Sequence, residues 1–225
     1  MNIDITPIDN RNIKIEEFLK FTQKELTKHR SKLEDTDYKK IAFTPSNHNN
    51  YKVFFEEIVP LMYFLQVEKD IYKKIKYTAG NQKGEAILDE STVIEATKAQ
   101  HSKHHMQVQD VLTHGHAFSS KKIIKNSHTI PTQTQPYSYE SNEHVDDLFS
   151  FIIKAIKDKQ KKDYPKNSIL IVLFECDTLM VESYGEYTYL ENKLKTINKS
   201  EHFSKIFIVE NFSVDTFQAK WSYIL

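Results

Sequence analysis

Two carboxylates, Glu85 and Glu95, are spaced so that a β-hairpin would place them opposite each other. The runs GEAIL and TVIEATKA are rich in β-branched and aliphatic residues, and the residues 89–91 between them are typical of a turn. With these three residues as the loop, Leu88 pairs with Thr92 and Glu85 faces Glu95. Opposed carboxylates repel each other, and burial strengthens the repulsion. A bound cation would relieve it, so this hairpin is the first candidate for a functional site.

Strand periodicity puts Glu85, Ile87, Glu95 and Thr97 on one face of the hairpin. Glu95 lies inside an otherwise apolar strand. Burial of an ion without a partner costs on the order of several kcal/mol. Glu95 is therefore expected to have a partner. The alternative interpretation is a solvated sheet surface on which glutamates have no special role.

Ten histidines form a second constellation, because His101, His104 and His105 follow the i, i+3, i+4 spacing of one helix face. Two histidines at i, i+4 suit Zn²⁺, which then needs a third ligand from elsewhere. The glutamate of the HExxH motif is missing between His101 and His105. Surface histidines, nucleic-acid contacts and a metal site all remain open for this cluster.

Lysines gather in two segments, KKIIK at residues 121–125 and a row along a predicted helix and its exit. Lysines at such spacings can follow the phosphates of a nucleic acid, with an affinity that falls with salt. The alternative is the solvated face of an amphipathic helix. The second row consists of Lys154, Lys157, Lys159, Lys161, Lys162 and Lys166.

Composition limits the class of protein. The 225 residues include 31 basic and 31 acidic side chains, which cancel and disfavour a uniformly basic nucleic-acid coat. Cys176 is the single cysteine, so an intramolecular disulfide is excluded and a cytoplasmic location is expected. The N-terminus lacks the apolar region of a signal peptide. The longest apolar run, Ile169–Phe174, is too short to span a bilayer, so no membrane partner is expected.

Apolar periodicity predicts an α/β protein with a mixed central sheet flanked by helices. Residues 1–50 are predicted as an N-terminal helical extension and residues 51–225 as the α/β domain. The expected helices are Ile13–Leu33, Tyr51–Tyr77 with a kink or a split at Pro60, Gln100–Thr113, His144–Lys162 and Tyr187–Ile197. Besides the hairpin, the expected strands are Ser168–Phe174 and Lys205–Val209, and the expected loop is Ser119–Glu140.

From about Tyr51 to Val209, this order of elements resembles the PD-(D/E)XK superfamily, which has the restriction-endonuclease-like fold. That fold has a core helix, an antiparallel hairpin that carries acidic residues, a crossover helix and a pair of buried strands. The resemblance implies a restriction-endonuclease-like core. It also implies Mg²⁺ or Mn²⁺ as cofactor and a nucleic-acid partner, DNA in the first place.

Carried over residue by residue, the resemblance puts Glu85 at the first acidic position and Glu95 at the second. Glu57, or its neighbour Glu56, matches an acidic residue that some members contribute from the preceding helix. The implied metal ligands are thus Glu85, Glu95 and Glu57. The lysine of the motif departs from the pattern, since Thr97 holds its usual position and Lys98 follows one residue later.

Lys98 would point away from Glu95 by strand alternation, so a catalytic role for it requires a β-bulge. With Glu85, Glu95 and Lys98 as the catalytic set, the expected function is a metal-dependent nuclease or nuclease-derived DNA-processing protein. The alternative is a catalytically inactive binding or interaction module on the same fold. Many nucleases of this fold act as homodimers, which the resemblance extends to this chain as an expectation.

Overall fold

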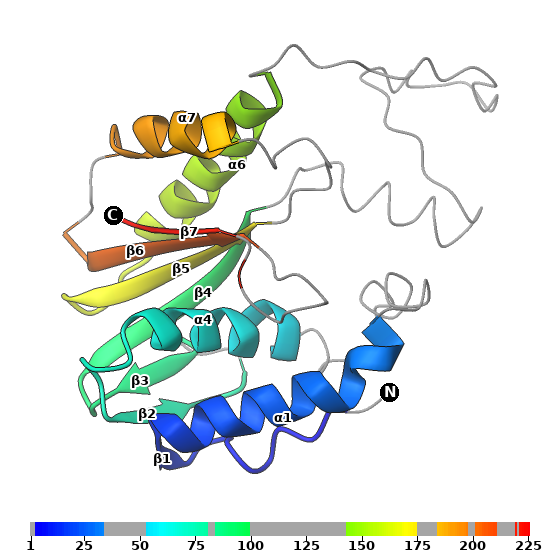
Figure 1. Cartoon of the computed structure of the whole chain (residues 1–225). Coiled ribbons are helices and arrows are strands. Elements are labelled where there is room, and N and C mark those ends of the chain that lie inside the picture. The colour runs from blue at the N-terminus through cyan, green and yellow to red at the C-terminus, as the bar shows by residue number, and fades with distance from the viewer. Residues whose placement is uncertain are drawn as a thin grey trace, which may run out of the picture.

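The computed structural model describes residues 3–33, 53–80, 84–99, 143–174, 184–197, 201–210, 219 and 221–225. These residues form a seven-stranded mixed sheet in which every strand lies beside its neighbour in sequence (Figure 1). The strands are β1 (Asn12–Lys14), β2 (Lys74–Tyr77), β3 (Ala86–Leu88), β4 (Thr92–Ala99), β5 (Ser168–Phe174), β6 (Phe203–Glu210) and β7 (Ser222–Ile224).

Helices cover both faces of the sheet, which confirms the α/β class and the mixed sheet between helices (Figure 1). One face carries α1 (Ile15–Leu33), the π-helical turn η1 (Phe54–Ile58) and α4 (Val59–Val67). The other face carries α6 (Glu143–Gln160) and α7 (Tyr184–Leu194). No helix in the described part of the chain is long and apolar enough to cross a membrane.

The centre of the sheet is parallel and its two sides are antiparallel. Strands β4, β5 and β6 run parallel, whereas β1 to β4 form antiparallel pairs and β7 runs antiparallel to β6. All seven residues of β5 are buried, as its continuous apolar run predicts. Ile171 packs into the core beneath α1 and α4, while the next residue, Val172, packs into the core beneath α6 and α7.

The predicted hairpin is confirmed, with Leu88 paired to Thr92 and Ile87 paired to Val93. Asp89 and Glu90 both have positive φ, and the Ser91 amide closes the turn on the Leu88 carbonyl at 3.1 Å. Asp89 also accepts the Lys74 amide at 2.8 Å, so its carboxylate ties the start of β2 to the turn.

Three short strands, β1, β2 and β7, are missing from the sequence-based prediction. The helix expected over Tyr51–Tyr77 is wrong at its C-terminal end, because Lys74–Tyr77 alternates exposed and buried residues as β2. Four alternating residues after a long apolar helix give too short a signal for a separate strand. The N-terminal segment, predicted as a helical extension, also contributes β1 to the edge of the sheet. The predicted helix Gln100–Thr113 and loop Ser119–Glu140 lie outside the described residues.

Pro60 coincides with a change of helix type. Before it, η1 has π geometry, in which the Val59 amide donates to the Phe54 carbonyl five residues earlier. Proline has no N–H and lies in the first turn of α4, so the regular α ladder is interrupted at this point. Of the two alternatives predicted at Pro60, a kink or a split, the structure has a change from π to α geometry just before the proline, and Glu56 and Glu57 lie on the π turn.

Candidate functional site

The hairpin register brings Glu85 level with Glu95, as the spacing of the sequence predicts. Ala86 pairs with Ile94, and the Glu85 amide, just before the start of β3, donates to the Ile94 carbonyl at 2.7 Å. Glu95 continues into the parallel ladder with β5, where it pairs with Leu170. The two glutamates thus lie where β4 passes from its antiparallel partner to its parallel one.

Gly84 begins this junction and has a conformation that other residues adopt only with strain, with φ at +89°. A Cβ atom at this position would lie 2.4 Å from Val93 Cγ1 and 3.0 Å from the Ile94 carbonyl oxygen. The Gly84 amide donates to Glu95 Oε2 at 3.1 Å. Glycine is therefore required both for the turn into β3 and for the placement of Glu95.

We expect Gly84→Ala to destabilise the protein by about 2 kcal/mol or more, because it adds a steric clash to a strained backbone. A urea unfolding curve measures this as a lower midpoint. Gly80→Ala is the matched control, since Gly80 also has positive φ but nothing lies within 4 Å of an added Cβ. Equal losses in the two variants would show that the close contacts at Gly84 contribute nothing.

Glu57 reaches the same junction from η1. Its carboxylate accepts a hydrogen bond from the Tyr77 hydroxyl at 2.7 Å, and it also shares a hydrogen bond with Glu85. Two carboxyl groups can share a hydrogen bond only when one of them holds a proton. Glu57 and Glu85 therefore form an acid pair that binds one proton between them.

Burial, together with the negative charges of Glu57 and Glu95, raises the pKa of Glu85 to about 8, although the Lys159 charge opposes the change. Burial is also the main cause that raises the pKa of Glu57. Burial and the Glu57 charge likewise raise the pKa of the Tyr77 hydroxyl, which remains a hydrogen-bond donor. The proton of the pair resides on Glu85, which donates to Glu57.

The raised pKa of Glu85 predicts that stability falls as pH rises. Between the ordinary glutamate pKa of 4.5 and about 8, the folded chain keeps a proton that the unfolded chain has lost. The free energy of unfolding therefore decreases across this window and levels off above it. The loss is on the order of 2 kcal/mol once the partial exposure of Glu85 is discounted.

Glu85→Gln tests this expectation, because glutamine keeps a hydrogen-bond donor at every pH. The variant should match the wild type near pH 4.5 and exceed its Tm by roughly 4 to 8 °C at pH 8.5. Thermal unfolding followed by circular dichroism between these pH values measures the difference. A wild-type advantage at pH 8.5 would contradict a proton held by Glu85.

Glu95 is 4% exposed and lies among three donors. Lys159 of α6 forms an ion pair with Oε1, and the Gly84 amide occupies Oε2. The Tyr164 hydroxyl also hydrogen-bonds to Glu95, and burial together with the Glu95 charge raises the pKa of Tyr164. The partner expected for a glutamate inside an apolar strand is thus a lysine from the crossover helix.

Lys98 does not lie at Glu95. Strand β4 pairs with β5 residue by residue from Ile94 to Ala99, so the bulge that would re-aim Lys98 is absent from this ladder. Its ammonium group lies 3.8 Å from Glu56 of η1, and its side chain is 11% exposed. The bulge that a catalytic Lys98 would require is therefore not formed, and Ala96 and Ala99 pack into different cores as regular strand alternation implies.

The donor set suits a hard divalent cation. Glu57, Glu85 and Glu95 each offer carboxylate oxygens, which Mg²⁺ and Mn²⁺ prefer, and their mutual repulsion is what a cation would relieve. In the described part of the chain, no group of three or more His, Cys, Asp or Glu side chains is arranged to hold a metal ion. A cation would therefore have to replace the shared proton and draw Glu95 away from Lys159.

Glu57, Glu85 and Glu95, with the groups that contact them, form what we call the carboxylate cluster. Sequence reasoning missed three of the contacting groups. Lys159 was grouped with the basic row of its helix, and Tyr77 and Tyr164 gave no signal at all. Lys159 and Glu95 lie 64 residues apart in sequence, so only the packing of α6 on β4 brings them together. The histidines His101, His104 and His105 lie outside the described residues.

The comparisons with known proteins add no relative to this description. No protein-family model matches the sequence, and neither the curated proteins nor the solved structures gave a match.

Proposed function

We propose that this chain is a metal-dependent nuclease, or a nuclease-derived DNA-processing protein, with a restriction-endonuclease-like core. The observation that carries the proposal is that the charges of Glu57 and Glu95 both act on Glu85, which lies beside Glu95 where β4 changes partners. The order of η1 and α4, the acidic hairpin, the crossover helix α6 and strand β5 supports the same core. Glu57, Glu85 and Glu95 are the proposed metal ligands, and Mg²⁺ or Mn²⁺ is the proposed ion.

Each residue of the carboxylate cluster has a separate task in this proposal. A divalent cation held by the three carboxylates would lower the pKa of an attacking water and neutralise charge on a phosphodiester. Lys159 contacts Glu95 and is the cation best placed to stabilise that charge or orient the water. Tyr77 and Tyr164 are positioning residues, because they hold Glu57 and Glu95 through hydrogen bonds.

One observation favours a second function, an inactive binding or interaction module on the same fold. Both oxygens of Glu95 already have protein donors, namely Lys159 and the Gly84 amide. The proton shared by Glu57 and Glu85 also removes part of the repulsion without a metal. A cluster satisfied in this way could be purely structural, in the way that many buried ion pairs are.

A cleavage assay separates the two functions. Wild-type protein is incubated with labelled duplex DNA, single-stranded DNA and RNA in Mg²⁺, in Mn²⁺ and in EDTA. The nuclease proposal predicts cleavage of at least one substrate with metal and none with EDTA. It also predicts that Glu85→Gln loses this cleavage while it remains folded. No cleavage of any substrate would favour the inactive module.

A further inference from the structure

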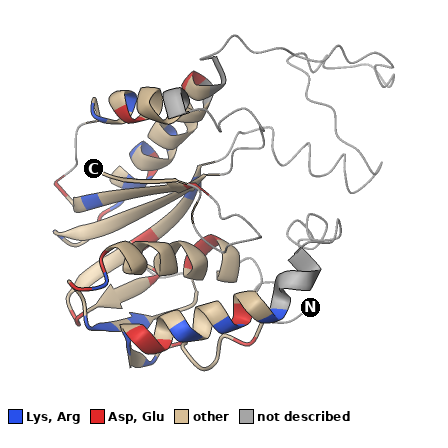
Figure 2. Cartoon of the chain, in the orientation of Figure 1, with Lys and Arg blue, Asp and Glu red and all other residues tan. Residues whose placement is uncertain are grey.

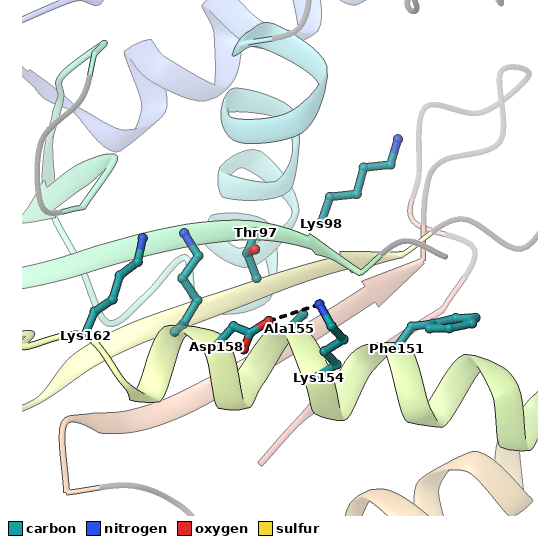
Figure 3. A pocket seen from close by; sticks show the side chains of 8 residues that line it. Thr97, Lys98, Phe151, Lys154, Ala155, Asp158 and Lys162 are labelled. Atoms are coloured by element: carbon teal, nitrogen blue, oxygen red, sulfur yellow. Dashed lines mark hydrogen bonds and ion pairs between the residues drawn. The ribbon is translucent and has the colours of Figure 1, made fainter. Parts of the chain in front are cut away.

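A pocket lies beside the carboxylate cluster, between strand β4 and helix α6 (Figure 3). Its volume is about 180 Å³, well below the roughly 300 Å³ at which sites for drug-sized ligands begin. It therefore suits one group of a larger ligand rather than a whole one. Its lining comprises Thr97, Lys98, Phe151, Lys154, Ala155, Asp158, Lys159 and Lys162.

The chemistry of the lining is that of an anion site. Lys154 extends from α6 toward β4, Lys162 extends from the turn that follows α6, and Thr97 of β4 lies opposite them with a hydroxyl that can donate (Figure 3). Lys159 of α6 completes the set of three lysines on this side of the pocket. Lys98 contributes from β4, but its side chain turns away from α6 (Figure 3) and its ammonium group pairs with Glu56.

Asp158 is the one acidic residue of the lining, and its negative charge would repel a bound anion. It pairs with Lys154 at 3.2 Å across a solvent-exposed surface, and exposed pairs of this kind contribute about 0 to 1 kcal/mol. An incoming phosphate can compete for Lys154 at that cost. Helix α6 carries both basic and acidic residues (Figure 2).

Lys159 connects the pocket to the carboxylate cluster, because it lines the pocket and forms the ion pair with Glu95. The chain as a whole has no net charge, whereas the three lysines here face two carboxylates, Asp158 in the lining and Glu95 beside it, which leaves a local excess of positive charge. A polyanion that placed one phosphate in this pocket would hold it beside the pair of Lys159 and Glu95.

We infer that the pocket between β4 and α6 binds a backbone phosphate of a nucleic acid and so guides the strand to the carboxylates. The substrate class rests on the proposed function, whereas binding itself requires no metal and no catalysis. The ammonium groups of Lys154, Lys159 and Lys162 and the hydroxyl of Thr97 are the phosphate donors. Phe151 borders the pocket and offers an aromatic face to a sugar or base.

Two double variants with the same change of charge test the inference. Lys154→Gln with Lys162→Gln removes two lysines of the pocket, and Lys157→Gln with Lys161→Gln removes two lysines of the same segment that do not line it. Each double variant deletes one lysine that pairs with Asp158. Glutamine also preserves helix propensity, so both variants are expected to fold.

The measurement is fluorescence anisotropy of a labelled 20-nucleotide probe, single-stranded or duplex, in EDTA at several salt concentrations. We expect the pocket variant to bind about tenfold more weakly than wild type, with a salt dependence lowered by roughly one unit per lysine. The control variant should bind within about twofold of wild type. Equal weakening in both variants would show a diffuse basic face and overturn the pocket.

The failures of the two proposals are distinguishable. Pocket-dependent binding without cleavage in Mg²⁺ or Mn²⁺ would remove the nuclease and leave the phosphate site in place. If the pocket variant binds and cleaves like wild type, the phosphate site is excluded and the nuclease proposal remains. No binding of the probe by wild-type protein, or binding of inorganic phosphate alone, would overturn the nucleic-acid ligand.

Discussion

We expect Lys159→Met to lower the free energy of unfolding by about 3 to 5 kcal/mol, because one partner of a buried ion pair is removed. The Lys159 side chain is 19% exposed and that of Glu95 is 6% exposed, so water replaces little of the missing contact. Without Lys159, the carboxyl groups of Glu57, Glu85 and Glu95 remain neighbours, and no ammonium group pairs with Glu95. Differential scanning calorimetry should show a Tm lower by roughly 6 to 20 °C.

Lys157→Met is the control for this loss, because Lys157 is an exposed lysine of the same helix two residues away. It should leave Tm within about 2 °C of wild type, as surface substitutions usually do. Glu95→Gln in the Lys159→Met background should recover part of the stability, since it removes the charge left without a partner. If Lys159→Met is as stable as Lys157→Met, the pair with Glu95 is of no structural consequence.

Glu95→Gln should reduce metal-dependent cleavage at least about a thousandfold, equivalent to roughly 4 kcal/mol of transition-state stabilisation. Glutamine retains an oxygen for the Gly84 amide but lacks the charge that a divalent cation needs. The loss of stability should be smaller than in Lys159→Met, because Lys159 is 19% exposed and keeps more contact with water than Glu95 does at 6%. Initial rates on a labelled oligonucleotide, with circular dichroism as the check on folding, measure both expectations.

Glu90→Gln is the matched control for the loss of cleavage. Glu90 belongs to the turn of the same hairpin, and its side chain contacts Asn12 at 3.4 Å rather than the carboxylate cluster. It should cleave at the wild-type rate. Cleavage retained by Glu95→Gln would place the active residues elsewhere in the chain or indicate a contaminating enzyme.

The hairpin could be predicted because its signals are local. Aliphatic runs on both sides of a polar turn fix the pairing of Leu88 with Thr92, and that pairing brings Glu85 to Glu95. The short strands β1, β2 and β7 could not be predicted, because three or four residues carry too little pattern. Their pairing depends on the neighbouring strands and on the helices that pack against them.

The carboxylate cluster was only partly predictable for a related reason. The sequence could not distinguish Glu57 from Glu56 as the third carboxylate. In the structure both lie on the π turn before Pro60. Glu57 contacts Tyr77 and Glu85, whereas Glu56 lies beside Lys98. A π turn has no sequence signature of its own, although such turns often lie at functional sites. The partner of Glu95 is Lys159, which the crossover helix supplies across the sheet face.

The two functions considered for this chain differ in what neutralises the carboxylate cluster. In the inactive module, Lys159 and the proton on Glu85 are the permanent counter-charges. In the nuclease, both are replaced or displaced when a divalent cation binds. The structure therefore makes cation binding at Glu95 the central question.

Calorimetric titration of Mn²⁺ into wild-type protein, Glu95→Gln and Glu90→Gln at pH 8 tests that question most directly. The nuclease proposal predicts saturable binding by wild type and Glu90→Gln, and a loss of at least about tenfold in affinity for Glu95→Gln. Absence of binding to all three proteins, or equal binding by all three, would contradict a carboxylate metal site and leave the inactive module as the function of this fold.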